Sequence, residues 1–216
     1  MPAPIPGPDP GSGDHYFSAR PAARSKPGRV RLELPEADHA HVLRTDAGVF
    51  SAGSVDPGTR VLLEDGARPG PSDRVLLDLG CGYGPIALAL ALREPEAIVW
   101  AVDVNERALE LTTTNAETLG VGDRVRVALP DAVPADVTFD AIWSNPPIRV
   151  GKAALHELLE TWLARLGPDG AAHLVVARNL GADSLHRWLA ERGHDVVRRS
   201  SRRGYRLLDV TPPANR

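Results

Sequence analysis

Apolar runs and stretches with helical periodicity alternate along the chain from residue 74 onward. The apolar runs are rich in Leu, Val and Ala, and each ends at a turn that carries Gly, Asn or Asp, so we interpret them as buried strands. They cover residues 75–79, 98–102, 125–129, 141–144 and 171–177. Helical periodicity marks residues 86–93, 106–119, 152–166 and 183–192. This order predicts an α/β fold whose parallel strands are covered on both faces and joined by right-handed crossovers.

The two ends of the chain depart from this alternation. Residues 195–199 and 205–210 have no helix between them, which predicts an antiparallel hairpin at the sheet edge. Near the start, we expect a small antiparallel β module from the alternating residues 29–34 and from residues 41–43 and 49–50, which flank a turn at 45–48. A short helix is expected at 59–64, ended by Gly66. We therefore divide the chain into a disordered Pro- and Gly-rich tail (1–14) and one domain (15–216), made of the β module (15–56) and a core (57–216).

Composition narrows the class of protein. The 216 residues have a net charge of -3, with 43% hydrophobic and 25% charged residues, which is typical of a globular protein and excludes a generally basic one that coats nucleic acid. The charge is uneven, because residues 187–216 hold eight arginines against three acidic residues. The longest apolar run, residues 86–92, is far shorter than the roughly 20 residues of a membrane helix, and no signal-peptide pattern opens the chain. We therefore expect a cytoplasmic protein without a membrane partner.

Metal and disulfide chemistry has little support in the sequence. Cys81 is the only cysteine, which excludes an intramolecular disulfide and a thiolate zinc cluster. The only histidines with ligand-like spacing are His39 and His41, and this pair is more typical of the face of a strand or turn. We therefore expect no metal site.

The stretch L-L-D-L-G-C-G-Y-G-P (76–85) is the richest in candidate chemistry. A buried strand runs into Gly80, Gly82 and Gly84 immediately before a helix, as in loops that bind nucleotides. Glycines there adopt positive φ and let a ligand lie against the backbone, while the first N–H groups of the helix point at it. A tight strand-to-helix turn uses the same residues, so the loop alone does not decide between a cofactor site and a turn.

Acidic residues at the ends of successive strands favour the cofactor site. Asp103 ends the second strand, where a carboxylate accepts hydrogen bonds from two ribose hydroxyls, and Asp131 follows the third, where it can accept from an adenine amino group. A role for Asp103 as a helix N-cap leaves Asp78 unexplained. The glycine spacing differs from that of NAD-binding loops, and Asp78 inside the turn would repel a pyrophosphate but attract a cation. S-adenosylmethionine (SAM), with its sulfonium and α-amino group, fits this pattern better than NAD.

The fourth strand ends in a second motif with chemical meaning, S-N-P-P-I-R-V-G-K (144–152). Pro146 and Pro147 have no N–H and hold the backbone rigid, and Asn145 is restricted to extended geometry by the proline that follows it. The Asn145 side-chain oxygen and the Pro146 carbonyl are two acceptors for the two hydrogens of a planar exocyclic amine. Binding in this way turns the lone pair of the amine toward an electrophile in the neighbouring loop. A turn that only closes the strand is the alternative.

Together these motifs resemble the class I SAM-dependent methyltransferases, and N-P-P-I-R-V-G-K with the upstream T-D-A-G-V-F-S and D-P-G-T is similar to the methyltransferase small domain family over residues 15–210. The resemblance implies a Rossmann-like seven-stranded sheet, mostly parallel, with an antiparallel C-terminal hairpin. It implies cofactor contacts from the glycine loop and the strand ends, namely Asp78, Gly80, Cys81, Gly82, Gly84, Asp103, Val104, Asp131, Ala132 and Asn145. It also implies that the target amine is held by the catalytic Asn145, Pro146 and Pro147, with Phe50 and Arg149 as substrate contacts.

That family contains ribosomal RNA guanine-N2 methyltransferases, so the resemblance implies N-methylation of an exocyclic amino group, with guanine N2 of ribosomal RNA as the first candidate and RNA or the small ribosomal subunit as the partner. Ile148 and Arg149 stand where relatives that methylate glutamine or adenine carry an aromatic residue, which favours guanine. Alternatives are a tRNA base, a protein glutamine, or a SAM-binding RNA-assembly module without turnover. Phosphate contacts are expected from basic residues of the N-P-P turn, the N-terminal module and the hairpin, namely Arg149, Arg20, Arg24, Arg29, Arg202 and Arg203. The hairpin arginines also suit a solvated edge strand.

Overall fold

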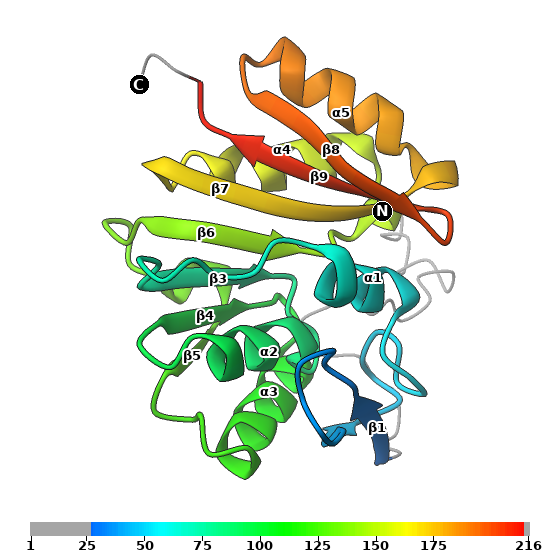
Figure 1. Ribbon diagram of the computed structural model, residues 1–216, viewed down its shortest axis with the longest axis vertical. Coiled ribbons are helices and arrows are strands. Elements are labelled where there is room, and N and C mark those ends of the chain that lie inside the picture. Colours follow the sequence, from blue (N-terminus) through cyan, green and yellow to red (C-terminus); the bar gives the residue numbers. More distant parts are fainter. Residues whose placement is uncertain (1–26, 214–216) are drawn as a thin grey trace, which may run out of the picture.

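The computed structural model describes residues 27–213, and seven of its strands form one sheet (Figure 1). Across the sheet the order is β5-β4-β3-β6-β7-β9-β8; the first five strands pair in parallel, and β9 is antiparallel to both of its neighbours. The expected Rossmann-like sheet with an antiparallel C-terminal hairpin is confirmed. The strands are β3 (Val75–Leu79), β4 (Ile98–Val102), β5 (Val125–Ala128), β6 (Phe139–Ser144), β7 (Leu166–Ala177), β8 (Asp195–Arg202) and β9 (Tyr205–Thr211).

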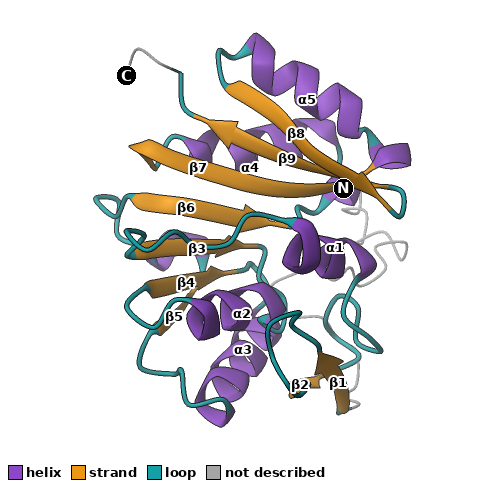
Figure 2. Ribbon diagram, in the orientation of Figure 1, coloured by secondary structure: helices purple, strands orange, loops and turns teal. Residues whose placement is uncertain are grey.

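Helices cover both faces of this sheet (Figure 2). Because successive side chains of a strand point to opposite faces, Leu76 joins an apolar core with α1, α2 and α3, whereas Leu77 joins a second core with α4 and α5. Short 3-10 turns follow three of the strands at the edge where the parallel strands end. The helices are α1 (Pro57–Asp65), α2 (Pro85–Arg93), α3 (Glu106–Thr118), α4 (Lys152–Leu163) and α5 (Ala182–Glu191), and the 3-10 turns are η1 (Pro130–Ala132), η2 (Ile148–Val150) and η3 (Arg178–Leu180).

The observed strand and helix boundaries agree best with the predicted ones where the sequence is continuously apolar. The boundaries of β3 and β4 are those expected from the apolar runs. The helix expected to reach residue 166 is too long: it ends at Leu163, because Leu166 pairs with Phe139 and opens β7. The polar segment 167–170 is therefore part of β7, and a register shift between β6 and β7 accommodates it.

The expected N-terminal β module is a two-stranded antiparallel ribbon, formed by β1 (Gly28–Leu32) and β2 (His41–Thr45). Its buried side chains belong to the same core as α2 and α3. The strand expected at residues 49–50 is wrong: these residues lie in a bend and a turn, because β1 pairs with β2 instead. The expected tail, Arg20 and Arg24 lie outside the described residues. Within residues 27–213, no helix has the length and apolar character needed to cross a bilayer.

Polar contacts fasten this ribbon to the core. The Asn115 side chain in α3 pairs with the backbone of β2, accepting from the Arg44 N–H at 2.7 Å and donating to the Arg44 carbonyl at 3.0 Å. Arg107 forms an ion pair with the buried Asp46 at 2.8 Å. These contacts hold the segment 46–56 beside the edge of the sheet at which the parallel strands end.

Candidate active site

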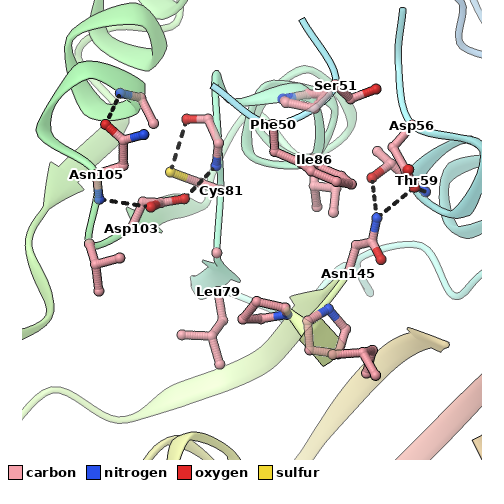
Figure 3. A pocket seen from close by; sticks show the side chains of 18 of the residues that line it. Phe50, Ser51, Asp56, Thr59, Leu79, Cys81, Ile86, Asp103, Asn105 and Asn145 are labelled. Carbon is pink, nitrogen blue, oxygen red and sulfur yellow. Dashed lines mark hydrogen bonds between the residues drawn. The ribbon is translucent and has the colours of Figure 1, made fainter. Parts of the chain in front are cut away.

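A cavity of about 250 Å³ lies at the carboxyl ends of β3, β4 and β6 (Figure 3), the edge at which open α/β sheets bind ligands. One wall is formed by the glycine loop after β3 and by the end of β4, including Gly80, Cys81, Gly82, Asp103 and Val104. The other wall combines the segment before α1, the N-P-P turn and the strands beyond it, including Phe50, Asp56, Asn145, Pro147, Leu180 and Tyr205.

The glycine loop forms an open cradle on the first wall. Gly80 and Gly82 have φ values of 78° and 57°, and a Cβ atom built at either residue meets no other atom within 4 Å. The N–H groups of Gly80 and Cys81 donate to the Val102 carbonyl at 2.8 and 3.0 Å, which fixes the loop to the end of β4. Because a ligand can approach this backbone without meeting a side chain, the loop fits the methionine portion of SAM.

Asp78 and Gly84 are buried behind this wall and do not line the cavity. A Cβ atom at Gly84 would lie 2.9 Å from Thr112 Cγ2, so this glycine serves the packing of α2 against α3. Asp78 is fully buried, and its Oδ2 accepts from the Ala87 N–H at 2.8 Å. No described residue donates to its Oδ1, and burial raises the pKa of Asp78 to about 8. A cation bound against the loop would stabilise the ionised carboxylate.

Asp103 lines the cavity just beyond the end of β4. Its Oδ2 accepts from the Gly82 N–H at 2.9 Å, and its Oδ1 accepts from the Asn105 N–H at 2.9 Å. Burial raises the pKa of Asp103, while these hydrogen bonds oppose the shift. The cap of α3 is a different residue, Asn105, which accepts from the Arg107 N–H at 3.0 Å. Two backbone N–H groups therefore hold Asp103 in a fixed orientation at the cavity, and it is not the N-cap of α3.

The residues expected around an adenine meet in a recess beside the cavity. Val104, Asp131 and Ala132 line this recess together with Leu129 and Pro130. Val104 and Pro130 line the main cavity as well, so the two spaces adjoin. The side chains of Val104 and Leu129 are 42% and 38% exposed, which leaves apolar surface free for a flat ring. The glycine loop after β3, Asp103 after β4 and Asp131 after β5 thus lie along two adjoining spaces at the same edge of the sheet.

The N-P-P turn is tied to the glycine loop and internally braced. The buried Ser144 donates from Oγ to the Leu79 carbonyl at 2.7 Å, which joins the ends of β6 and β3. Pro147 has φ -73° and ψ 73°, the geometry of an inverse γ-turn, and the Ile148 N–H donates to the Pro146 carbonyl at 2.8 Å. That carbonyl keeps a second lone pair, so it remains an acceptor for a substrate.

Residues that the sequence did not single out complete the second wall. Asp56 and Thr59, in the cap and first turn of α1, accept hydrogen bonds from the Asn145 side chain (Figure 3). Tyr205 of β9 and Leu180 of η3 also line the cavity. The D-P-G-T sequence was a signal for Asp56, because an Asp before Pro is typical of a helix start, but nothing in it points to Asn145.

The two expected substrate contacts lie at the cavity, whereas the hairpin arginines are engaged elsewhere. Phe50 lines the cavity with 45% of its surface exposed, and the exposed Arg149 lines it from η2. Arg202 forms an ion pair with Asp65 at 2.6 Å, and Arg203 pairs with the neighbouring Glu64 at 3.3 Å, so the hairpin tip is fastened to the end of α1. Surface ion pairs of this kind suit the alternative expectation of a solvated edge strand.

The sheet, the glycine cradle and the strand-end acids define a SAM-dependent methyltransferase. The chain belongs to the methyltransferase small domain family, whose model matches residues 40–209. The expected family and cofactor are thereby confirmed. Among residues 27–213, no three His, Cys, Asp or Glu side chains gather into a group that could hold a metal ion.

Similar proteins span both uncharacterised and characterised members. The chain is 34% identical over 198 residues to the uncharacterized protein YbxB of Bacillus subtilis, covering 90% of this chain and 96% of that one. It is 38% identical over 144 residues to the ribosomal RNA small subunit methyltransferase C of Hahella chejuensis, covering 64% of this chain and 41% of that one. A similar structure, with a TM-score of 0.72 and 26% identity, is the T. thermophilus 16S rRNA N2 G1207 methyltransferase (RsmC) in complex with AdoMet and guanosine, covering 89% of this chain and 52% of that one. The chain thus spans about half or less of the length of these two ribosomal RNA methyltransferases.

Proposed function

We propose that this protein transfers the methyl group of SAM to the exocyclic N2 of guanine in ribosomal RNA. The observation that carries the proposal is the pair of acceptors, Asn145 Oδ1 and the Pro146 carbonyl, on the wall opposite the glycine cradle. The similarity to an RNA guanine-N2 methyltransferase whose complex contains AdoMet and guanosine supports the choice of base.

The first wall would hold SAM. Asp103 would accept from the ribose hydroxyls, Val104 and Ala132 would contact the adenine, and the backbone of Gly80 and Gly82 would contact the methionine portion. When bound, SAM supplies an electrophilic methyl group on a sulfonium. The buried Asp78 carboxylate behind the loop favours that positive charge, because an opposite charge stabilises its ionised form.

The second wall would orient the amine. Asn145 Oδ1 and the Pro146 carbonyl would each accept one N–H of the amino group, so that its lone pair would face the wall that holds the cofactor. In-line transfer then needs an approach of about 3 to 3.5 Å and little help from a base, because positioning alone removes a large part of the barrier. The nitrogen–carbon bond forms as the sulfur–carbon bond breaks, and the extra proton leaves the nitrogen for solvent.

The rim of the cavity suits a base presented by RNA. The exposed ring of Phe50 offers a stacking surface to a base extruded from its neighbours. Arg149 on the rim and the outward-facing Arg29, Arg31 and Arg44 of the ribbon form no ion pair with any described residue, so they are available to phosphates. These contacts would bring an RNA strand past the mouth of the cavity.

A second candidate substrate is a protein glutamine. The chain is 34% identical over 148 residues to the release factor glutamine methyltransferase of Rhodopirellula baltica, covering 67% of this chain and 46% of that one. A glutamine side chain also presents a planar amide with two hydrogens to the same acceptors. Ile148, which follows the N-P-P motif, and the unpaired arginines favour RNA.

Transfer of a labelled methyl group from SAM separates the two candidates. Total RNA and total protein from a strain that lacks this gene are incubated with the purified protein and radiolabelled SAM. The proposal requires label in RNA and none above background in protein. Label confined to protein would replace the RNA substrate with the glutamine one, and no label in either would favour a binding module without turnover.

A further inference from the structure

Two residues at the start of α1, its N-cap and a residue of its first turn, accept hydrogen bonds from the Asn145 amide. We infer that Asp56 and Thr59 are positioning residues of the methyl-transfer site, which hold the Asn145 oxygen toward the substrate by binding its nitrogen. The inference rests on the proposed function, because it gives a task to the acceptor that is proposed to bind the amine. Neither residue needs to touch the substrate for this role.

The hydrogen-bond geometry fixes which end of the amide faces the cavity. Asn145 Nδ2 donates to Asp56 Oδ1 at 2.7 Å and to Thr59 Oγ1 at 3.1 Å, so both of its hydrogens have partners (Figure 3). Both side-chain hydrogen bonds of Asn145 within residues 27–213 are made by Nδ2. Its Oδ1 is therefore left to accept from a ligand. A flipped amide would place Oδ1 against a carboxylate oxygen, and an ionised carboxylate has no hydrogen to donate.

Asp56 is itself held in place by the helix that it caps. Its Oδ1 also accepts from the Gly58 N–H at 2.8 Å and from the Thr59 N–H at 3.1 Å, and the N-terminus of a helix favours a negative charge. The first turn of α1 also packs closely against β9, since a Cβ atom at Gly58 would lie 2.8 Å from the ring of Tyr205. The carboxylate is therefore a fixed reference point for the amide.

The other end of Asn145 is fixed through the backbone. The preceding Ser144 donates to the Leu79 carbonyl at 2.7 Å, one residue before the glycine cradle. Asn145 is thus held from β6 through its main chain and from α1 through its side chain. Preorganised acceptors cost no reorganisation during transfer, and a misplacement of about 1 Å is enough to reduce a rate roughly a hundredfold.

Two substitutions at Asp56 separate positioning from helix capping. Asp56→Ser keeps a good N-cap for α1 but is too short to reach Asn145, whereas Asp56→Asn keeps both the cap and an acceptor for the Asn145 nitrogen. We expect single-turnover methyl transfer to fall at least about tenfold in Asp56→Ser and to stay within about threefold in Asp56→Asn. Thr59→Val, which preserves the shape of this buried side chain, should give a smaller loss. SAM affinity and melting temperature should match the wild type in all three.

Exchanging the donor and the acceptor gives a sharper test. Asn145→Asp alone places two carboxylates at the position of a 2.7 Å contact, where they must share a proton, so transfer should fall and depend on pH. Adding Asp56→Asn to Asn145→Asp removes one of the two like charges while keeping an oxygen of residue 145 toward the substrate. We expect the double variant to transfer at least about tenfold faster than Asn145→Asp. A merely structural role for Asp56 predicts no such recovery.

A spectroscopic readout keeps the inference separate from the proposed function. The side-chain NH₂ resonances of Asn145, identified by their loss in Asn145→Ala, should shift in Asp56→Ser and remain near their wild-type position in Asp56→Asn. Unchanged resonances in Asp56→Ser, or wild-type transfer by that folded variant, would overturn the inference. If the wild type transfers no methyl group to RNA, the proposed function fails, and the resonances alone then decide whether Asp56 orients the amide.

Discussion

Replacing Asp103 should weaken SAM binding more than any other single change on the first wall. Both of its oxygens point into a region where backbone N–H groups already hold them at 2.9 Å, from Gly82 on one side and Asn105 on the other. These hydrogen bonds hold the carboxylate in the orientation that the proposed ribose contact needs. On that proposal, Asp103→Ala removes a charged acceptor from two ribose hydroxyls, and it also removes the acceptor of the Gly82 N–H in the glycine loop.

The size of the effect follows from the number of contacts. A hydrogen bond to a charged group contributes about 1.5 to 3 kcal/mol, so loss of one to two contacts weakens binding by roughly 3 kcal/mol. This corresponds to a dissociation constant that is roughly a hundredfold higher, since each 1.4 kcal/mol is about tenfold. Asp103→Asn keeps one acceptor oxygen and the side-chain volume, so its effect should be roughly tenfold.

Calorimetric titration with SAM measures both changes. Asp140→Ala is the matched control, because Asp140 accepts from the Arg74 and Val75 N–H groups at 2.7 and 2.9 Å but lies at the opposite edge of the sheet. Its SAM affinity should equal that of the wild type. An unchanged dissociation constant for a folded Asp103→Ala would refute the placement of the ribose at Asp103.

Three further predictions concern the rest of the site. Asn145→Ala should keep the dissociation constant for SAM within a few fold while single-turnover transfer is almost lost, because the acceptor acts on the amine in the transition state; full transfer would reduce the N-P-P motif to a turn. Arg149→Gln should reduce the magnitude of the slope of log K for RNA against log salt by about 0.7 to 0.9, whereas Arg202→Gln should leave the slope unchanged because Arg202 is already paired with Asp65; equal slopes for Arg149→Gln and the wild type would remove Arg149 from the RNA contact. The folded-state pKa of Asp78 is raised to about 8, so the unfolded chain loses this proton at a lower pH than the folded protein does. The free energy of unfolding without ligand should therefore fall as pH rises from about 4 to 8, by at most about 1.4 kcal/mol per pH unit. Denaturant unfolding of Asp78→Asn should lack this component, and parallel pH profiles would contradict the buried state of Asp78.

The fold was predictable because its central strands carry their own signal. β3 and β4 are buried on both faces, so their runs of Leu, Val and Ala have clear ends, and the acids and glycines that follow them mark the ligand edge. The signal fails where tertiary pairing decides. Residues 167–170 were assigned to no element but belong to β7, whose first residue Leu166 pairs with Phe139. Residues 49–50 were expected to form a strand beside β2, but β2 pairs with β1 instead.

The candidate site was predictable only for groups that lie within one motif. Gly80, Gly82, Asp103 and Asn145 each follow a strand, so their meeting at one edge follows from the topology. Asp56 contacts Asn145 across 89 residues of sequence, and no local pattern encodes that distance. Its position depends on how α1 packs beside the sheet, which only the three-dimensional structure reveals.

The identity of the methylated nucleoside tests the central claim most directly. RNA labelled by the wild-type protein is digested to nucleosides and separated beside authentic standards, with Asn145→Ala as the inactive control. We predict that the label co-migrates with N2-methylguanosine and is absent in the control. Label in any other nucleoside, or equal labelling by Asn145→Ala, would contradict the account of the N-P-P turn as a holder of the guanine amine.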